Sequence, residues 1–177
     1  LGRGAAQQDM VLFVLDLAKP LVLDADGLNA LANLEDWPAL RTAPLVLTPH
    51  PGEFARLTRR AVSEIQADRE HAAAVAVREW TDRRTDRDPP LVCLLKGAGT
   101  IVTDGGRLYV NETGNPGMAT GGAGDVLTGL IAALMAQGLS ALAAACLAAR
   151  VHGRAGDLAA RTLGEVSVIA TDLVDHL

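Results

Sequence analysis

The chain has 177 residues, enough for one domain that buries roughly 70 % of the surface its unfolded chain would expose. Hydrophobic residues make up 49 % of it and aromatic residues only 3 %, so Ala, Val and Leu must fill the core, which suits alanine-rich helices packed on the strands of an α/β fold. The net charge of −5, without clusters of Lys and Arg interleaved with aromatic residues, argues against a nucleic-acid-binding protein.

The two cysteines and the most apolar stretch of the sequence indicate the cellular compartment to expect. Cys93 and Cys146 lack metal-ligand spacing to another Cys or His, which favours free thiols in a reducing environment, and we expect a cytoplasmic protein. We expect no membrane partner, because the most apolar stretch, residues 126–151, is interrupted by Gln137-Gly138.

The first predicted elements are a helix over residues 5–17 and, after Pro20, a short buried strand over residues 21–23. Asp26 is a good N-cap for the helix that follows, and Asn29 lies in its first turn. Two interpretations stay open. The polar residues of this segment only cap the helix, or they bind a ligand at the carboxyl end of a parallel strand, where open α/β sheets have their sites.

The same pattern repeats at a second strand, residues 45–47. Pro51 is a favoured first residue of the next helix, and Glu53, at the third helical position, can bond back to the cap. Capping explains Glu53 and His50. However, the two prolines that flank His50 fix it rigidly at the strand end, which is more typical of a binding group.

Residues 63–66 have capping-box spacing and predict one long helix that reaches Trp80. A third strand, residues 91–95, leads into Lys96-Gly97-Ala98-Gly99-Thr100. Lys96 is either a solvated lysine before a turn or a cation that, with exposed backbone N–H groups, lies near a nucleotide phosphate. Residues 100–103 and 107–111 then predict a hairpin, so we expect a mostly parallel sheet with an antiparallel edge.

The glycine-rich stretch from Asn115 to Asp125 precedes a predicted helix over residues 126–136. Unpaired N–H groups and the helix dipole favour an anion at such a junction, and glycine lets the backbone approach it closely. Asp125 either complements the dipole or takes a proton from a hydroxyl nucleophile. Helices over residues 141–158, or a little beyond, and 171–177, the second capped by Thr171, complete the prediction.

These motifs resemble a known family. Residues 115–129, Asn-Pro-Gly-Met-Ala-Thr-Gly-Gly-Ala-Gly-Asp-Val-Leu-Thr-Gly, resemble the signature of the ADP/ATP-dependent NAD(P)H-hydrate dehydratases, a branch of the ribokinase-like superfamily. Residues 22–29, 47–53 and 96–100 match three further family motifs in the family's order. The resemblance implies one domain over residues 1–177, a ribokinase-like three-layer α/β/α sandwich.

The resemblance also implies a reaction. Members of the family remove water from the 6S hydrate of NADH or NADPH, with ADP in most bacterial members and ATP in eukaryotic ones. The nucleotide phosphorylates the hydroxyl, and phosphate then leaves, which with ADP gives AMP and phosphate. This first step is kinase-like, and Mg²⁺ binds largely through phosphates in such reactions.

Site residues carry over from the motifs by position. Asp125 would be the base, and the backbone N–H groups of its three predecessors would stabilise the transferring phosphoryl group: Gly122, Ala123 and Gly124. Lys96, Gly97, Ala98, Gly99, Thr100 and Gly124 would bind the nucleotide. The hydrate would meet Gly2, Asp26, Asn29, His50 and Asp125. Glu53 would act on the metal only through water.

The chain begins Leu1-Gly2-Arg3-Gly4, which resembles the remainder of a Gly-Pro-Gly-Leu-Gly motif, so we expect a domain incomplete at its N-terminus. The family also implies an N-terminal epimerase domain in many bacterial proteins. We expect a homo-oligomer, although the alanine-rich faces of the C-terminal helices suit the sheet as well as another subunit. Two other functions stay open: a small-molecule kinase of the same superfamily and a nucleotide-binding module without catalysis.

Overall fold

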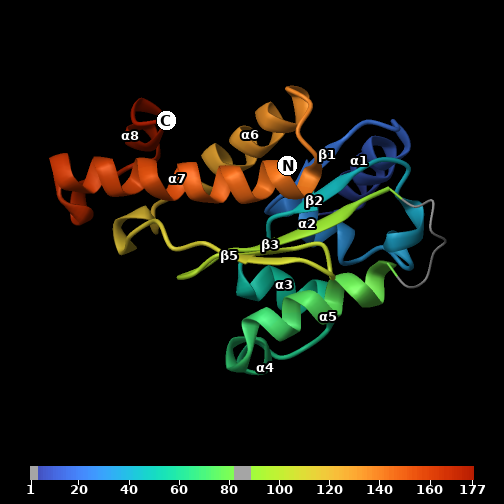
Figure 1. Ribbon diagram of the computed structural model, residues 1–177. Coiled ribbons are helices and arrows are strands. Elements are labelled where there is room, and N and C mark those ends of the chain that lie inside the picture. The colour runs from blue at the N-terminus through green and yellow to red at the C-terminus, as the bar shows by residue number, and fades with distance from the viewer. Residues whose placement is uncertain (1–3, 82–88) are drawn as a thin grey trace.

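The computed structural model describes residues 4–81 and 89–177, and its centre is a five-stranded sheet (Figure 1). The strands are β1 (Leu21–Leu23), β2 (Leu45–Leu47), β3 (Leu91–Leu95), β4 (Ile101–Thr103) and β5 (Leu108–Val110), adjacent in that order. The first three run parallel, and β4 and β5 form an antiparallel hairpin at one edge. The predicted sheet is confirmed.

Alternation along the strands gives the sheet two apolar faces. Val46, Val92 and Val102 face α6 (Ala123–Ala136) and α7 (Ala141–Leu163), whereas Leu45, Leu47 and their neighbours face the other side. The second layer comprises α1 (Ala5–Asp16), α2 (Asp26–Leu31), α3 (Pro51–Thr58), α4 (Val62–Ala67) and α5 (Arg69–Thr81). Figure 1 shows α3 and α5 below the sheet and α6 and α7 above it. The three-layer α/β/α architecture is therefore confirmed.

The two layers are filled differently. On the α5 side, Trp80 packs edge-on against Trp37 and Phe54, with ring centroids 5.1 and 6.0 Å apart. On the other side, the alanines of α7 are buried against the sheet: Ala141, Ala144, Ala145, Ala148 and Ala149. The alanine-rich face of this helix thus packs within the chain, because small side chains let its backbone approach the strands.

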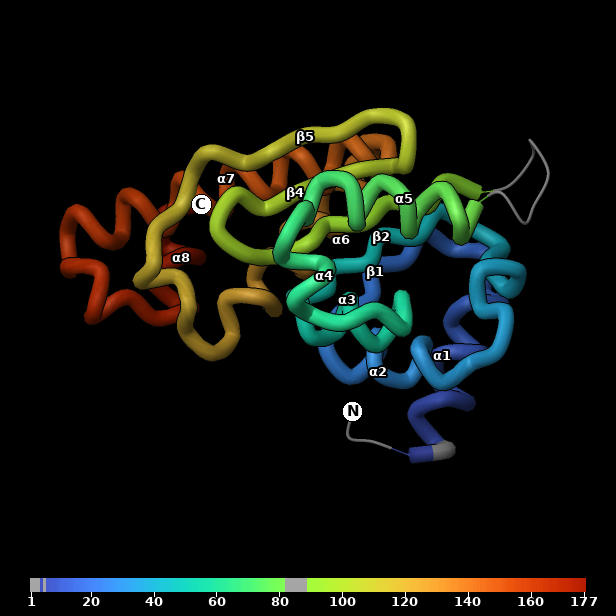
Figure 2. The backbone as a smooth tube through the Cα atoms, turned by 90° about the horizontal axis from the view of Figure 1, so that it is seen from below, coloured from blue at the N-terminus to red at the C-terminus, as the bar shows by residue number. Residues whose placement is uncertain are grey.

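Short helical turns and a last helix complete the chain. The 3₁₀ turns are η1 (Trp37–Leu40), η2 (Pro116–Met118) and η3 (Glu165–Ser167), and α8 (Ala170–Asp175) packs on α6 and α7 through Leu173. Figure 2 shows the chain after β5 running beside α7 before it enters α6. Among the described helices, none combines the length and apolar character needed to cross a bilayer.

Several predicted helix boundaries were wrong. Asp26 is the first residue of α2 and Ala25 its N-cap, so Asp26 does not cap. The long helix predicted from Ser63 is two helices that break at Asp68, whose Oδ1 accepts from the backbone N–H of His71 at 3.0 Å and so starts α5. The Asp68 side chain thus accepts a backbone hydrogen bond locally, and the helix ends there instead of continuing.

The C-terminal boundaries moved as well. Helix α6 begins at Ala123, three residues early, and α7 continues to Leu163. Ile169, not Thr171, is the N-cap residue of α8, and Asp172 Oδ2 accepts from the backbone N–H of Ile169 at 2.9 Å.

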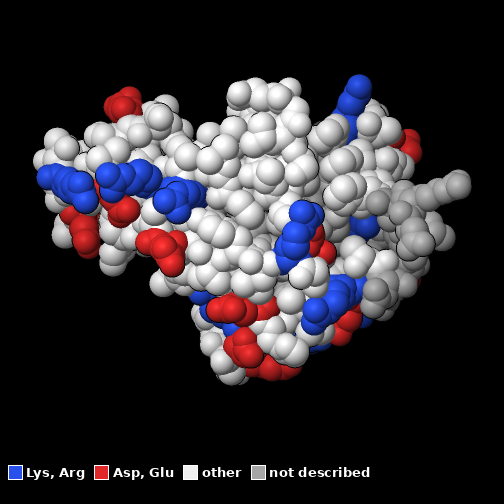
Figure 3. Space-filling model, viewed as in Figure 1, with Lys and Arg blue, Asp and Glu red and all other residues white. Residues whose placement is uncertain are grey.

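On the face shown in Figure 3, basic side chains over α7 lie beside acidic ones, so charges of both signs are mixed there.

Candidate active site

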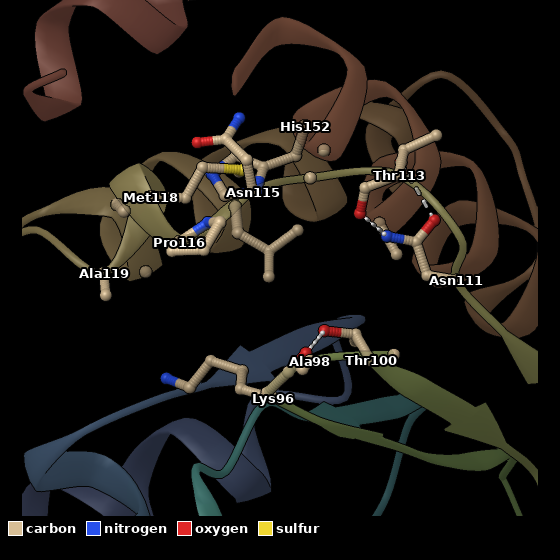
Figure 4. Close-up of a pocket in the computed structure, with 18 of the residues that line it drawn as sticks. Lys96, Ala98, Thr100, Asn111, Thr113, Asn115, Pro116, Met118, Ala119 and His152 are labelled. Carbon is tan, nitrogen blue, oxygen red and sulfur yellow. Dashed lines mark hydrogen bonds between the residues drawn. The ribbon is translucent and has the colours of Figure 1, made fainter. Parts of the chain in front are cut away.

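A cavity of about 1000 Å³ opens at the carboxyl ends of the central strands. Its walls come from the loop after β3, the segment between β5 and α6, the start of α6 and the middle of α7. Figure 4 shows Lys96, Ala98 and Thr100 on one wall and Met118 and His152 on the wall opposite. The sheet register aligns the strand ends, because Leu23 pairs with Leu47 and Leu47 with Cys93.

An ion pair joins two of these strand ends. Lys96 Nζ, after β3, lies 2.6 Å from Asp24 Oδ1, after β1, and the two side chains are 22 % and 10 % exposed. Asp24 Oδ2 also accepts from the Thr128 hydroxyl of α6 at 3.1 Å. Lys96 Nζ is 3.9 Å from Glu53 Oε2. Lys96 is therefore not a solvated turn lysine, since two carboxylates hold its ammonium group near the start of α6.

His50 and Glu53 form a capping box at the start of α3, as predicted. His50 Nδ1 accepts from the backbone N–H groups of Gly52 and Glu53 at 3.0 and 3.4 Å, and Glu53 Oε2 accepts from the N–H of His50 at 2.8 Å. Because backbone N–H groups can only donate, Nδ1 is an acceptor and Nε2 carries the proton of a neutral ring. Nε2 lies 3.4 Å from Glu53 Oε1, and the His50 side chain is 52 % exposed at the cavity.

The glycine-rich stretch follows a bend that α7 supports. Asp157 of α7 accepts from the N–H of Gly114 at 3.1 Å and from the Asn115 side chain at 3.2 Å. Gly122 then caps α6 with φ of +88°, in the left-handed region that glycine occupies readily. The loop is thereby anchored at both ends, with Gly121 and Gly122 exposed and Gly117 and Gly124 half-buried.

The first turn of α6 lies against the ion pair. A Cβ added at Gly124 would come within 3.2 Å of Asp24 Oδ2 and 3.5 Å of Lys96 Nζ, so the backbone of Gly124 approaches the ion pair closely. Among the described residues, the N–H groups of Gly122 and Gly124 have no acceptor, whereas that of Ala123 donates to Thr120 O at 3.4 Å. Asp125 is exposed beside them, in the first turn of the helix. Unpaired N–H groups at a helix N-terminus can hold an anion.

Other residues named from the sequence lie elsewhere. Neither Asp26 nor Asn29 lines the cavity, and Asn29 Oδ1 accepts from Arg56 at 2.8 Å, an arrangement that joins α2 to α3. Gly122 and Asp125 are also outside the cavity lining, next to the lining residues Ala123 and Gly124. Gly2 lies outside the described residues. Across residues 4–81 and 89–177, no group of three or more His, Cys, Asp or Glu side chains could hold a metal ion.

Sequence reasoning did not assign roles to His152 or Asp157. His152 lines the cavity from α7, and its buried Nε2 has no hydrogen-bond partner in the described part of the chain. Burial lowers the pKa of His152, and a backbone hydrogen bond with Ala123 partly opposes this shift. His152 lies 23 residues after Gly129, the last residue of the glycine-rich motif, and carries no local signal in the sequence, so only the packing of α7 on α6 reveals its place.

The chain was compared with known proteins. The family model described as NAD(P)H-hydrate dehydratase matches residues 1–177. The chain is 49 % identical over 179 residues to the bifunctional NAD(P)H-hydrate repair enzyme Nnr of Moorella thermoacetica, covering 100 % of this chain and 32 % of that protein. It is 43 % identical over 149 residues to the ADP-dependent (S)-NAD(P)H-hydrate dehydratase of Neisseria meningitidis, covering 82 % and 47 % of the two chains.

A solved structure agrees with these matches. The ADP/ATP-dependent NAD(P)H-hydrate dehydratase from Bacillus subtilis, co-crystallised with ATP/Mg²⁺, superposes with a TM-score of 0.84 and 30 % identity. The match covers 99 % of this chain and 59 % of that one. The chain thus spans about a third of the length of the bifunctional relatives that it matches.

Proposed function

This chain belongs to the NAD(P)H-hydrate dehydratase family, and from that premise we propose that it uses ADP to dehydrate the 6S hydrate of NADH or NADPH. The observation that carries the proposal is the meeting of four elements at one cavity. Gly124, in the first turn of α6, lies against the Asp24–Lys96 pair, and Gly124, Lys96 and His50 all line the cavity. Asp125 is exposed in the same turn of the helix. A phosphoryl group and a hydroxyl group can meet at such a junction.

The proposed chemistry has two steps. The hydroxyl oxygen of the hydrate attacks the β-phosphorus of ADP while Asp125 takes the hydroxyl proton, and AMP leaves. The C–O bond of the phosphate ester then breaks, phosphate leaves with the electron pair, and the neighbouring carbon loses a proton to water, which restores the double bond of the dihydropyridine. Hydroxide, a poor leaving group, is thereby replaced by phosphate. The chain mainly positions groups and stabilises charge in this scheme.

The anion-stabilising groups are the backbone N–H groups at the start of α6. Gly122, Ala123 and Gly124 were assigned this role from the motif, and the unpaired N–H groups of Gly122 and Gly124 support it most directly. In the first turn, the positive end of the helix dipole adds to them. Since donors fixed before the reaction need no rearrangement, they stabilise charge at the moment it develops.

The nucleotide is proposed to occupy the cavity between Lys96–Thr100 and α7. The loop supplies unpaired backbone N–H groups, and Lys96 supplies a cation whose position is set by Asp24. On the hydrate side we keep His50, which lines the cavity, and Asp125, which is exposed in the first turn of α6 next to the lining residue Gly124. Asp26 and Asn29 remain part of the proposal, although Asn29 Oδ1 is engaged by Arg56 at 2.8 Å.

The bound metal in this proposal is Mg²⁺ held by the nucleotide phosphates. Glu53 suits contact through water rather than direct ligation, since Oε2 already accepts from His50 N and Oε1 faces His50 Nε2. Mg²⁺ normally keeps several waters when phosphates bind it, so one carboxylate in the outer shell is a chemically reasonable site. When bound, the ion would neutralise charge on the phosphates.

We also propose a domain organisation and an oligomeric state for the whole protein. Relatives named bifunctional repair enzymes are about three times as long as the stretch matched here, which supports a fusion to an epimerase domain. We further propose that the protein is a homo-oligomer.

The direct test is to incubate the purified protein with 6S-NADH hydrate, ADP and Mg²⁺, and to follow recovery of the NADH absorbance. We expect NADH, AMP and phosphate in equal amounts. No recovery with either ADP or ATP would refute the proposed function. A stable phosphorylated product without elimination would instead favour a small-molecule kinase.

A further inference from the structure

Arg69, the first residue of α5, binds the nucleotide loop from behind. Its Nη2 donates to the backbone carbonyls of Leu95 and Lys96 at 3.2 and 3.1 Å, and its Nη1 donates to that of Ala98. Burial lowers the pKa of the guanidinium, although an arginine stays protonated at neutral pH. One planar side chain thus holds three carbonyl groups of a single turn.

The hydrogen bonds from Arg69 to the loop carbonyls also fix the direction of the loop's N–H groups. In a trans peptide the C=O of one residue and the N–H of the next point in opposite directions, and the described peptide bonds include no cis bond. Because Lys96 O and Ala98 O point toward Arg69, the N–H groups of Gly97 and Gly99 point away from it. The Thr100 hydroxyl holds the intervening carbonyl, Gly97 O, at 3.0 Å.

The side away from Arg69 is the cavity. Residues 97–100 line the cavity and Arg69 does not, because α5 lies across the sheet from α7 (Figure 1). Within the described part of the chain, the N–H groups of residues 97–100 have no acceptor. Successive unpaired N–H groups in a turn form a concave site for an anion.

Gly97 shows how closely the guanidinium and the loop are fitted. A Cβ at this position would lie 2.8 Å from Arg69 Nη2, and the residue has φ of +141°, which side chains rarely adopt. Gly99, with φ of +60°, provides the second reversal of the turn. The loop conformation therefore depends on Arg69 and on glycine together.

We propose that Arg69 is a positioning residue for the nucleotide: by holding the loop carbonyls on the α5 side, it makes the N–H groups of Gly97 and Gly99 available to a phosphate oxygen of ADP or ATP. The inference rests on the proposed function, because it takes the anion in the cavity to be a nucleotide phosphate. It adds a residue that lies outside the family motifs and touches neither substrate.

The test compares two arginines of the same helix. Arg78, also on α5, donates to Gly105 O of the β4–β5 turn at 3.1 Å, away from the cavity, so Arg78→Ala is a matched control that removes a similar bond. The dissociation constant of ADP with Mg²⁺ would be measured by calorimetry for the full protein and for Arg69→Ala, Arg69→Lys and Arg78→Ala. Thermal unfolding of each variant reports its stability.

We expect Arg69→Ala to raise the Kd for ADP roughly tenfold or more, as for the loss of a well-oriented bond to a charged oxygen. Guanidinium chloride at about 10 mM should restore much of the affinity by refilling the site, an effect that a merely structural role would not give. Arg69→Lys should bind ADP nearly as weakly as the alanine variant, because one ammonium lacks the planar fork. Arg78→Ala should lower the unfolding temperature and leave the Kd unchanged.

Equal Kd values for Arg69→Ala and Arg78→Ala would overturn the inference, and so would full affinity in Arg69→Lys if the alanine variant does not fold. A different result would refute the proposed function, namely a wild-type protein that binds neither ADP nor ATP. A wild-type protein that dehydrates the hydrate, together with an Arg69→Ala variant of unchanged ADP affinity, would refute only the role of Arg69.

Discussion

Replacement of His50 separates a helix cap from a substrate contact, the two interpretations that its sequence context leaves open. His50 caps α3 through Nδ1, its Nε2 lies 3.4 Å from Glu53 Oε1, and its half-exposed side chain lines the cavity. His50→Asn keeps a cap acceptor, because asparagine is among the best N-cap residues, and removes the imidazole. His50→Ala removes both. The difference between the two variants therefore measures the cap, and the remaining defect of the asparagine variant measures the imidazole.

The magnitudes follow from the contacts. In His50→Ala the N–H groups of Gly52 and Glu53 lose their acceptor, which costs about 1 kcal/mol at an exposed helix end where water can replace it. The bond from residue 50 N to Glu53 Oε2 survives because it uses the backbone of residue 50 and the unchanged Glu53 side chain. The unfolding temperature of His50→Ala should be about 2–4 °C lower than that of the wild type, as expected for a chain of this size. His50→Asn should unfold within about 1 °C of the wild type, since its cap is intact.

Activity should depend on the imidazole. If Nε2–H donates to the hydrate, both variants lose one hydrogen bond of about 1–3 kcal/mol, and kcat/KM falls roughly 5- to 150-fold. The assay is recovery of NADH absorbance at varied hydrate and saturating ADP. His71→Asn, at an exposed histidine of α5, is the control and should match the wild type.

A wild-type kcat/KM in His50→Asn would refute the substrate contact and leave His50 as a cap alone. If instead kcat/KM fell in proportion to the loss of folded protein in His50→Ala and not at all in His50→Asn, the defect would be one of stability.

Three further predictions address the base, the packing of α7 and a buried histidine. Asp125→Asn should lower kcat by about 10²–10⁴ while calorimetry finds the Kd for ADP little changed; a fully active variant would remove Asp125 as the base. Gly153→Ala should destabilise by about 1–3 kcal/mol in urea unfolding, because its Cβ would lie 2.3 Å from Thr113 Oγ1, whereas Gly129→Ala on α6, with no atom within 4 Å, should be neutral or stabilising. The pKa of His152 is held below its usual 6.5, so the unfolded chain binds a proton that the folded chain resists, and the free energy of unfolding should fall as pH drops below about 6.5. His152→Gln should remove this pH dependence of the free energy of unfolding between pH 5 and 7. The same pH dependence in the variant and the wild type would contradict the prediction.

The local elements of this protein could be predicted because their causes lie within a few residues. Short apolar runs bounded by Pro, Gly or Asp predicted all five strands. The capping box of His50 and Glu53 also formed as expected, because its donors and acceptors are three residues apart. Helix starts were less predictable: at Asp68 a single side-chain acceptor divided an otherwise helical run.

The candidate site depended on the sequence for its motifs and on the tertiary structure for its pairings. The glycine-rich stretch and its acid were recognisable as an anion site, since glycine content and a following helix are local features. That Asp24 pairs with Lys96, 72 residues away, follows only from the placement of β1 and β3 on either side of β2. The contact of Arg69 with the loop after β3 likewise requires α5 to pack under that strand. Propensities and caps act over one or two turns of chain, whereas these bonds depend on sheet order and layer packing, which no local pattern encodes.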